Sequence, residues 1–251
     1  MGHKQSHINI THPNLADLPE LKFDYSAVPL GIINNGHTIM INYAPGSTLT
    51  VGNKVYTLKQ FHFHHPSEEH IDGKGFDMVA HLVHADAGGN SAVVAILFKA
   101  GAANPILDTL WNNIPPEKDK TLEVSAISVN VKELLPSQHG YYTYSGSLTT
   151  PSCTEGVTWY ILKSTSSLPD QQLAAIAKLI GKCLNPNSFP GQEGTAASSR
   201  FARGWISIAA AAGSVGKEMA NENLASGPPL SRISVRTYLC QKSVLLNPFH
   251  S

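Results

Sequence analysis

Two histidines separated by one residue are the clearest candidates for chemistry in this chain. His62 and His64 alternate with phenylalanines in the segment Gln60-Phe61-His62-Phe63-His64. On a β-strand this alternation projects both imidazoles to the same face, where both can reach one metal ion. A His-x-His pair is also common among half-exposed strand histidines, so the pair alone does not establish a metal site.

His81 is the histidine best placed to supply a third ligand, because it lies in the next predicted strand, Met78 to His84. Three neutral imidazoles without a thiolate or carboxylate suit Zn²⁺ and leave the fourth position open for water. Such a site makes hydroxide available at ordinary pH. The spacing leaves other three-histidine barrels as alternatives. His65 and His84 are expected to point to the opposite face.

The segments around these histidines predict a single β-dominated domain with peripheral helices. Gly52-Asn53 indicates a hairpin between Leu49 and Leu58. Apolar periodicity and flanking Pro and Gly residues indicate the helices. We expect strands over His37–Asn42, Gln60–His64, Met78–His84 and Ser91–Phe98, and short helices over Asn104–Asn113 and Gln171–Ile180.

The composition of the chain limits the kinds of partner and site that we expect. The 251 residues contain 18 Lys+Arg and 18 Asp+Glu, so no net charge attracts nucleic acid or an anionic membrane. No apolar stretch approaches the ~18 residues of a membrane span, and the polar start lacks the apolar core of a signal peptide. Three cysteines are too few and too scattered for a disulfide framework or a cysteine-based zinc site.

Longer blocks around the histidines resemble the α-class carbonic anhydrases of bacterial type, in the order that the family uses. The resemblance runs from about residue 5 to residue 187. It implies a mainly β (α+β) domain built around a large, twisted, mostly antiparallel β-sheet with short peripheral helices. The matching blocks are Gln5–Ile10, Asn35–Thr38, Gln60–His64, Pro66–Glu68, His81–His84 and Tyr142–Trp159.

The resemblance also implies roles for individual residues. His62, His64 and His81 match the zinc ligands, with Gln60 as the amide partner of His62. Thr149 matches the hydroxyl that accepts a hydrogen bond from zinc-bound hydroxide. Glu68 matches the carboxylate that takes the proton of that threonine, and its interval to His81 favours it over Glu69. His37 matches the proton shuttle, Thr150 a bicarbonate contact, and the apolar wall for carbon dioxide is matched by Val83, Val93, Leu148 and Trp159.

The function implied is the reversible hydration of carbon dioxide to bicarbonate and a proton by zinc-bound hydroxide. Carbon dioxide, bicarbonate and sulfonamide or anion inhibitors are the implied partners, with neither nucleic acid nor membrane among them. A folded but catalytically weak or inactive zinc-binding relative is the alternative. Relatives of this type are often periplasmic or secreted, although no signal peptide is seen in this chain.

Several positions depart from the family pattern. Val79 stands where a carboxylate usually holds the His81 ligand, and losing such a partner typically costs 10–100-fold in metal affinity or activity. His7 replaces a proline, and Cys153 has no expected disulfide partner. We expect a carbonic anhydrase domain over residues 1–188 that lacks the usual N-terminal segment. A tail of unknown structure is expected over residues 189–251.

Overall fold

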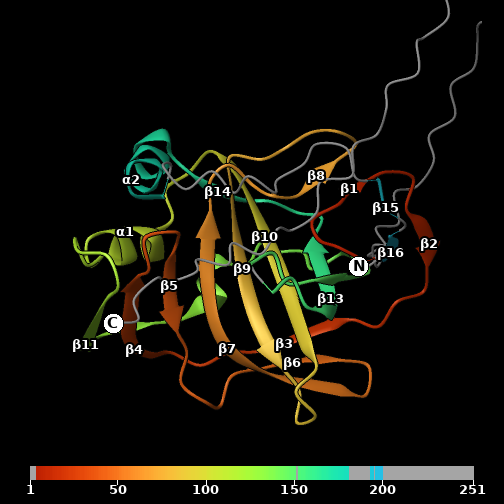
Figure 1. The fold of residues 1–251 in the computed structure, drawn as a ribbon, viewed down its shortest axis with the longest axis horizontal. Helices are drawn as coiled ribbons and strands as arrows, with labels where there is room; N and C mark the ends of the chain where they lie inside the picture. The colour runs from red at the N-terminus through yellow and green to blue at the C-terminus, as the bar shows by residue number, and fades with distance from the viewer. Residues whose placement is uncertain (1–3, 151, 181–192, 195, 200–251) are drawn as a thin grey trace, which may run out of the picture. The chain divides into compact units, whose positions relative to one another are not determined.

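A large β-sheet makes up most of the described part of the chain (Figure 1). The computed structural model describes residues 4–150, 152–180, 193–194 and 196–199. They belong to one unit, Met1–Phe201. The strands are β1 (Asn9–Ile10), β2 (Asn14–Ala16), β3 (Leu21–Asp24), β4 (Val28–Asn34), β5 (Ile39–Asn42), β6 (Thr48–Val51), β7 (Lys54–His64), β8 (His70–Ile71), β9 (Met78–Ala85), β10 (Ser91–Ala100), β11 (Lys120–Val129), β12 (Tyr141–Ser147), β13 (Glu155–Leu162), β14 (Ser166–Leu168), β15 (Glu193–Gly194) and β16 (Ala197–Ser199).

The main sheet contains 13 strands in the described part of the chain, and its principal path is β11-β4-β5-β7-β9-β10-β13-β12-β16-β2. Its pairs are mostly antiparallel, but β10 runs parallel to β13 and β14, and β16 runs parallel to β2. A smaller, parallel sheet has the order β15-β1-β8. The predicted fold class is therefore confirmed.

In the described part of the chain, two helices and one 3₁₀ turn accompany the sheet. The helices α1 (Pro105–Trp111) and α2 (Asp170–Ile180) lie beside each other (Figure 1), and the 3₁₀ turn spans Val131–Leu134. Pro105 begins α1 at a position where no intrahelical N–H is needed. Neither described helix has the length and apolar character needed to cross a membrane.

Most predicted elements are present with small changes at their ends. The β6–β7 hairpin, β9, β10 and both helices coincide with the predicted segments. The strand predicted from His37 begins only at Ile39. Asn35 Oδ1 accepts hydrogen bonds from the backbone N–H groups of His37 and Thr38, so these two residues stay in the turn.

Strand β10 separates two apolar clusters, because successive side chains on a strand face opposite sides. Its even-numbered residues from Ala92 to Phe98 join the main core, which also contains Phe61 and Phe63. Its odd-numbered residues from Val93 to Leu97 join a smaller cluster around Trp159. We call this smaller group the site-face cluster, because it lies on the face that carries the candidate ligands.

The predicted tail, residues 189–251, lies outside the described residues except for 193–194 and 196–199. These short segments form β15 and β16. β15 pairs with β1, and β16 pairs with β12 and β2. The described parts of the predicted tail are therefore strands of the same sheets as the preceding chain.

Candidate metal centre

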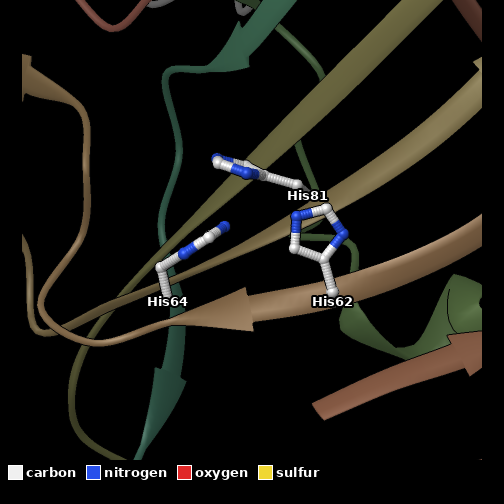
Figure 2. Close-up of side chains that lie close together, drawn as sticks. All are labelled: His62, His64 and His81. Atoms are coloured by element: carbon white, nitrogen blue, oxygen red, sulfur yellow. The ribbon is translucent and has the colours of Figure 1, made fainter. Parts of the chain in front are cut away.

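Three histidines converge from two neighbouring strands. His62 and His64 lie on β7, and His81 lies on β9 directly opposite His62 in the ladder. Their potential ligand nitrogens all lie within 4.8 Å of one another. Figure 2 shows the three rings turned toward a common space. The strand pairing thus assembles the three imidazoles predicted as metal ligands.

One ring nitrogen of His62 and one of His81 take part in hydrogen bonds. His62 Nδ1 lies 2.9 Å from Gln60 Oε1, and His81 Nε2 lies 2.6 Å from Glu69 Oε1. An amide oxygen only accepts, so His62 carries its proton on Nδ1 and keeps the lone pair of Nε2. His64 Nε2 is buried without a hydrogen-bond partner among the residues described. Nitrogens left in this way fit a zinc ion, which needs imidazole lone pairs.

Burial keeps the three rings neutral. It lowers the pKa of His64 to about 4, with Glu68 opposing and His81 reinforcing the shift. It lowers the pKa of His81 to about 4 as well, and that of His62 well below its usual range. Neutral imidazole is the form that binds a metal, so the ligands need no deprotonation at neutral pH.

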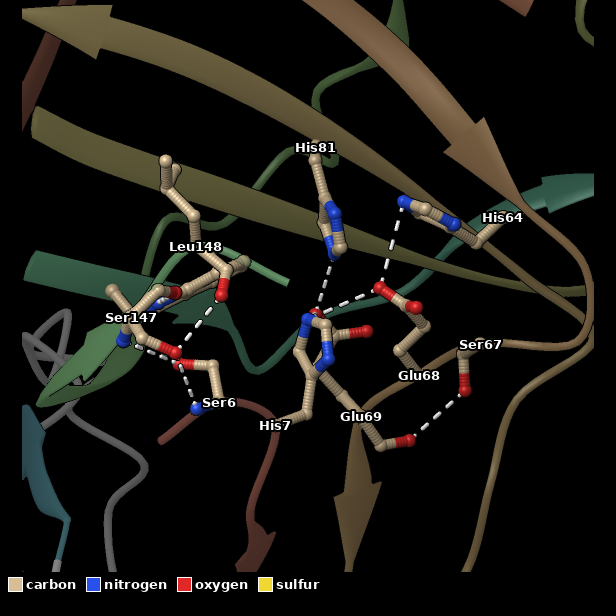
Figure 3. A network of polar contacts seen from close by, with 10 residues as sticks. Ser6, His7, His64, Ser67, Glu68, Glu69, His81, Ser147 and Leu148 are labelled. Carbon is tan, nitrogen blue, oxygen red and sulfur yellow. Dashed lines mark hydrogen bonds and ion pairs between the residues drawn. The ribbon is translucent and has the colours of Figure 1, made fainter. Parts of the chain in front are cut away.

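A buried polar network adjoins the triad (Figure 3). His7 Nε2 lies 3.3 Å from Glu68 Oε2 and 3.4 Å from Glu69 Oε1. The His7 ring stacks on His81, with centroids 5.2 Å apart, and meets Trp159 edge-on. Burial lowers the pKa of His7 well below its usual range, and the neighbouring histidines add to the shift. His7 is therefore a neutral group that packs on His81 and Trp159 and faces the two carboxylates.

A second set of potential ligand atoms also lies within 4.8 Å, contributed by His7, Glu68 and His81. All three residues are buried, whereas His62 and His64 are partly exposed. A catalytic metal needs a position that water and substrate can reach. The triad of His62, His64 and His81 meets that requirement better than the buried set does.

The two adjacent carboxylates have different surroundings. Glu68 Oε2 lies 3.5 Å from His64 Nε2, in addition to its contact with His7. Glu69 faces His81, and burial raises the pKa of the Glu69 carboxyl to about 8. A cation held by the triad would favour the ionised form of Glu69.

Thr149 and Thr150 lie in the loop that follows β12. Backbone hydrogen bonds from Leu148 N to Thr154 O and from Cys153 N to Thr150 O close this loop. Thr149 is partly buried and Thr150 exposed. The hydrogen bond expected from Thr149 to Glu68 stays a prediction.

The four residues predicted as an apolar wall belong to the site-face cluster. Val93 and Trp159 are buried in it, and Val83 and Leu148 pack against it. The edge of the Trp159 ring also meets His81, with centroids 5.0 Å apart. The predicted apolar wall thus contacts one of the predicted ligands, His81.

His37 lies in the turn before β5 and is exposed. β5 pairs with β7 through Met40 and His62, which places the turn near the end of the ligand strand. No hydrogen bond or ion pair in the described part of the structure joins the His37 side chain to the triad. Its role as a proton shuttle stays a prediction.

Sequence reasoning missed two participants in the network, Glu69 and the side chain of His7. The sequence favours Glu68 over Glu69, and it marks His7 only as a residue that stands in place of a proline. The signal available was a His substitution together with a Glu-Glu pair ahead of a strand that lacks its usual carboxylate. Cys153, which had no expected partner, is disulfide-bonded, and the other two cysteines lie outside the described residues.

The chain is similar in sequence and in structure to known proteins. A family model described as eukaryotic-type carbonic anhydrase matches residues 1–188. A carbonic anhydrase from Pectobacterium carotovorum is 42% identical over 179 residues, which cover 71% of this chain and 73% of that protein.

Two solved structures are similar over most of their length. A hyperthermostable carbonic anhydrase from a hydrothermal vent chimney has a TM-score of 0.73 at 40% identity, covering 79% of this chain and 89% of that one. The α-carbonic anhydrase of Thermovibrio ammonificans, solved with the inhibitor sulfanilamide, has a TM-score of 0.73 at 34% identity, with coverage of 79% and 88%.

Proposed function

The chain belongs to the eukaryotic-type carbonic anhydrase family, enzymes that hydrate carbon dioxide, and we propose that its own reaction takes place at a zinc site formed by His62, His64 and His81. The observation that carries the proposal is the convergence of three neutral imidazoles beside an apolar wall. Zinc bound there would supply a hydroxide nucleophile at neutral pH, and this family is itself the standard example of that effect.

Gln60 and Glu69 support the proposal because they restrict the ring orientations of His62 and His81. The side-chain oxygen of each residue accepts a hydrogen bond from one ring nitrogen of its histidine. This contact sets which of the two nitrogens of His62 or His81 faces the metal. Because β7 and β9 are paired backbone to backbone, the rings are held before any metal arrives. This arrangement reduces the reorganisation needed for binding.

We assign Thr149 and Glu68 to orienting the nucleophile. A threonine hydroxyl that donates to a carboxylate can only accept from the nucleophile, which directs the nucleophile's lone pair at carbon dioxide. The burial of Glu68 beside His64 supports this assignment, because the carboxylate lies at the ligand set. Loop closure between Leu148 and Thr154 supports it by restricting the segment that carries Thr149.

Val83, Val93, Leu148 and Trp159 form the surface on which carbon dioxide is expected to rest. Carbon dioxide offers little to hydrogen-bond, so an apolar wall desolvates it without leaving polar groups unpaired. Thr150, which is exposed, is assigned a hydroxyl contact to bicarbonate as the product leaves.

His37 is assigned the transfer of the product proton to buffer. An imidazole titrates near neutrality and can therefore accept and release protons at working pH. Its exposure at the turn before β5 supports this role, because the proton must reach solvent. By family membership we also propose inhibition by sulfonamides and simple anions, which compete for the metal.

The proposal is tested by stopped-flow hydration of carbon dioxide with a pH indicator, on protein whose zinc content has been measured. We expect zinc-dependent turnover in the wild type and none in His64→Ala, which loses one of three ligands. His12→Asn is the matched control, because His12 is exposed and has a positive φ of 47° that asparagine tolerates. It should retain full turnover.

Absence of turnover in wild-type protein that holds one zinc and melts cooperatively would overturn the enzymatic proposal. That result would leave a zinc-binding relative without activity. Turnover that persists in His64→Ala would instead overturn the assignment of the triad.

A further inference from the structure

His81 needs a hydrogen-bond partner that its own strand does not provide. A metal-binding histidine normally donates its second ring nitrogen to a carboxylate, carbonyl or water, which fixes the tautomer and ring orientation. On β9 the residue on the same face two positions earlier is Val79, whose side chain is apolar and fully buried.

Glu69 supplies the missing carboxylate from a different segment. Its Oε1 lies 2.6 Å from His81 Nε2, the shortest ion-pair distance among the described residues. Both side chains are about 1% exposed, so water does not compete for the contact. A hydrogen bond between charged and neutral partners is stronger in such surroundings than at the surface.

The backbone around Glu69 is held in place. Ser67 Oγ donates to Glu69 O at 2.9 Å and accepts from Phe76 N at 2.8 Å. Ser67 N donates in turn to Phe76 O at 3.0 Å. The segment between β7 and β8 is therefore tied to the chain entering β9, and the carboxylate is presented from a fixed support.

His7 also contacts Glu69, beside His81. Its Nε2 lies 3.4 Å from the same Oε1 that faces His81, and its ring stacks on the His81 ring at an interplanar angle of 22°. One carboxylate oxygen thus lies close to the Nε2 atoms of two stacked imidazoles (Figure 3).

We propose that Glu69 is the positioning residue of the ligand His81, taking the place of a carboxylate that Val79 does not provide, with the His7 ring packed against His81 beside this contact. This inference rests on the proposed zinc site. The carboxylate that holds His81 thus lies on the segment before β8 rather than on β9. The predicted cost of Val79 is accordingly offset within the same structure.

The test measures zinc dissociation constants by chelator competition, which does not depend on turnover. Glu69→Ala should bind zinc 10–100-fold more weakly than the wild type. Glu69→Gln, which keeps the shape and one accepting oxygen but loses the charge, should show a smaller loss. The matched control Glu123→Gln alters an exposed carboxylate on β11 and should bind zinc as the wild type does.

A second variant separates positioning from packing. In Glu69→Ala/Val79→Glu the carboxylate is moved to the ligand strand rather than removed, and we expect zinc affinity to recover toward the wild-type value. Urea unfolding of each metal-free variant measures any loss of stability separately. The visible absorption bands of the cobalt-substituted protein should shift in Glu69→Gln and remain unchanged in Glu123→Gln.

Zinc dissociation constants in Glu69→Ala and Glu69→Gln within twofold of the wild type would overturn the inference and leave the zinc site intact. A loss that follows metal-free stability and is not restored by Val79→Glu would also overturn it, since Glu69 would then be a packing residue. A wild-type chain that binds no zinc would overturn the proposed function itself.

Discussion

At the scale of single residues, the histidines of β7 and β9 have two different kinds of surroundings. His62, His64 and His81 share one face of the sheet and converge on one point. His84, three residues beyond His81, lies on the opposite face in the main core, where its Nε2 lies 2.7 Å from the hydroxyl of Tyr25. The alternation of a single strand therefore separates the proposed ligand His81 from the core histidine His84.

His84 makes stability depend on pH. Burial lowers its pKa from 6.5 to about 4, so between these values the unfolded chain binds a proton that the folded chain excludes. Stability is fully present above pH 6.5 and falls as the pH drops toward 4. Between pH 7 and pH 5 this group alone should remove about 2 kcal/mol of unfolding free energy. Tyr25, the group facing His84, stays neutral because burial raises its pKa.

His84→Gln isolates this contribution, because glutamine does not titrate. Urea unfolding of chelator-treated wild type and His84→Gln at pH 7 and pH 5 is the measurement. We expect the wild type to lose about 2 kcal/mol more than the variant on acidification. Equal losses would show that His84 does not titrate in this window.

At the scale of elements, β5 is joined to β7 beyond the end of their backbone ladder. The Thr38 hydroxyl donates to Phe63 O at 2.5 Å and accepts from Phe63 N at 3.2 Å. In the sequence, Phe63 lies between two of the proposed ligands, His62 and His64. The Thr38 side chain thus takes the place of a pair of backbone hydrogen bonds to Phe63 on β7.

Thr38→Val tests this connection, because valine has a similar shape and no hydroxyl. The change leaves two buried backbone groups of Phe63 without their partner, which should cost about 1–3 kcal/mol of unfolding free energy. Thr50→Val on β6 is the control, since no side-chain hydrogen bond of Thr50 is found in the described structure, and it should change stability by less than ~0.5 kcal/mol. Similar losses in both variants would contradict the role assigned to Thr38.

The sequence predicted the elements that carry a local signal. Period-two alternation located β7 and its ligands, and Gly52-Asn53 located the β6–β7 turn, because both signals depend only on near neighbours. The contact of Glu69 with His81 could not be predicted in this way. It depends on how the segment after β7 folds back, which the hydrogen bonds of Ser67 to Glu69 and Phe76 determine and no periodic sequence pattern marks.

At the scale of the whole molecule, the boundary expected at residue 188 bears on stability. Ala196 is buried in the site-face cluster, and its carbonyl accepts a hydrogen bond from Asn14 N. Residues 197 and 198 pair with β12. The strand that follows the expected boundary therefore covers edges of the sheet that would otherwise be unpaired.

Two truncations test that boundary. A chain ending at residue 201 keeps β15 and β16, whereas one ending at residue 188 loses both. We expect the shorter chain to be less stable by at least about 2 kcal/mol, because several backbone hydrogen bonds and a buried alanine are removed. Urea unfolding of the two chains is the measurement. Equal unfolding free energies would show that the domain ends at residue 188.

The parallel pairing of β10 with β13 has a consequence for the order in which the site is assembled. The three ligands come from β7 and β9, which are near neighbours in sequence, whereas Trp159 comes from β13, and long-range parallel pairing closes late. A chain emerging from the ribosome can pair β7 with β9 before β13 has been synthesised. Binding of zinc at the proposed site would then precede packing of the proposed apolar wall, and loading with the metal would be part of folding.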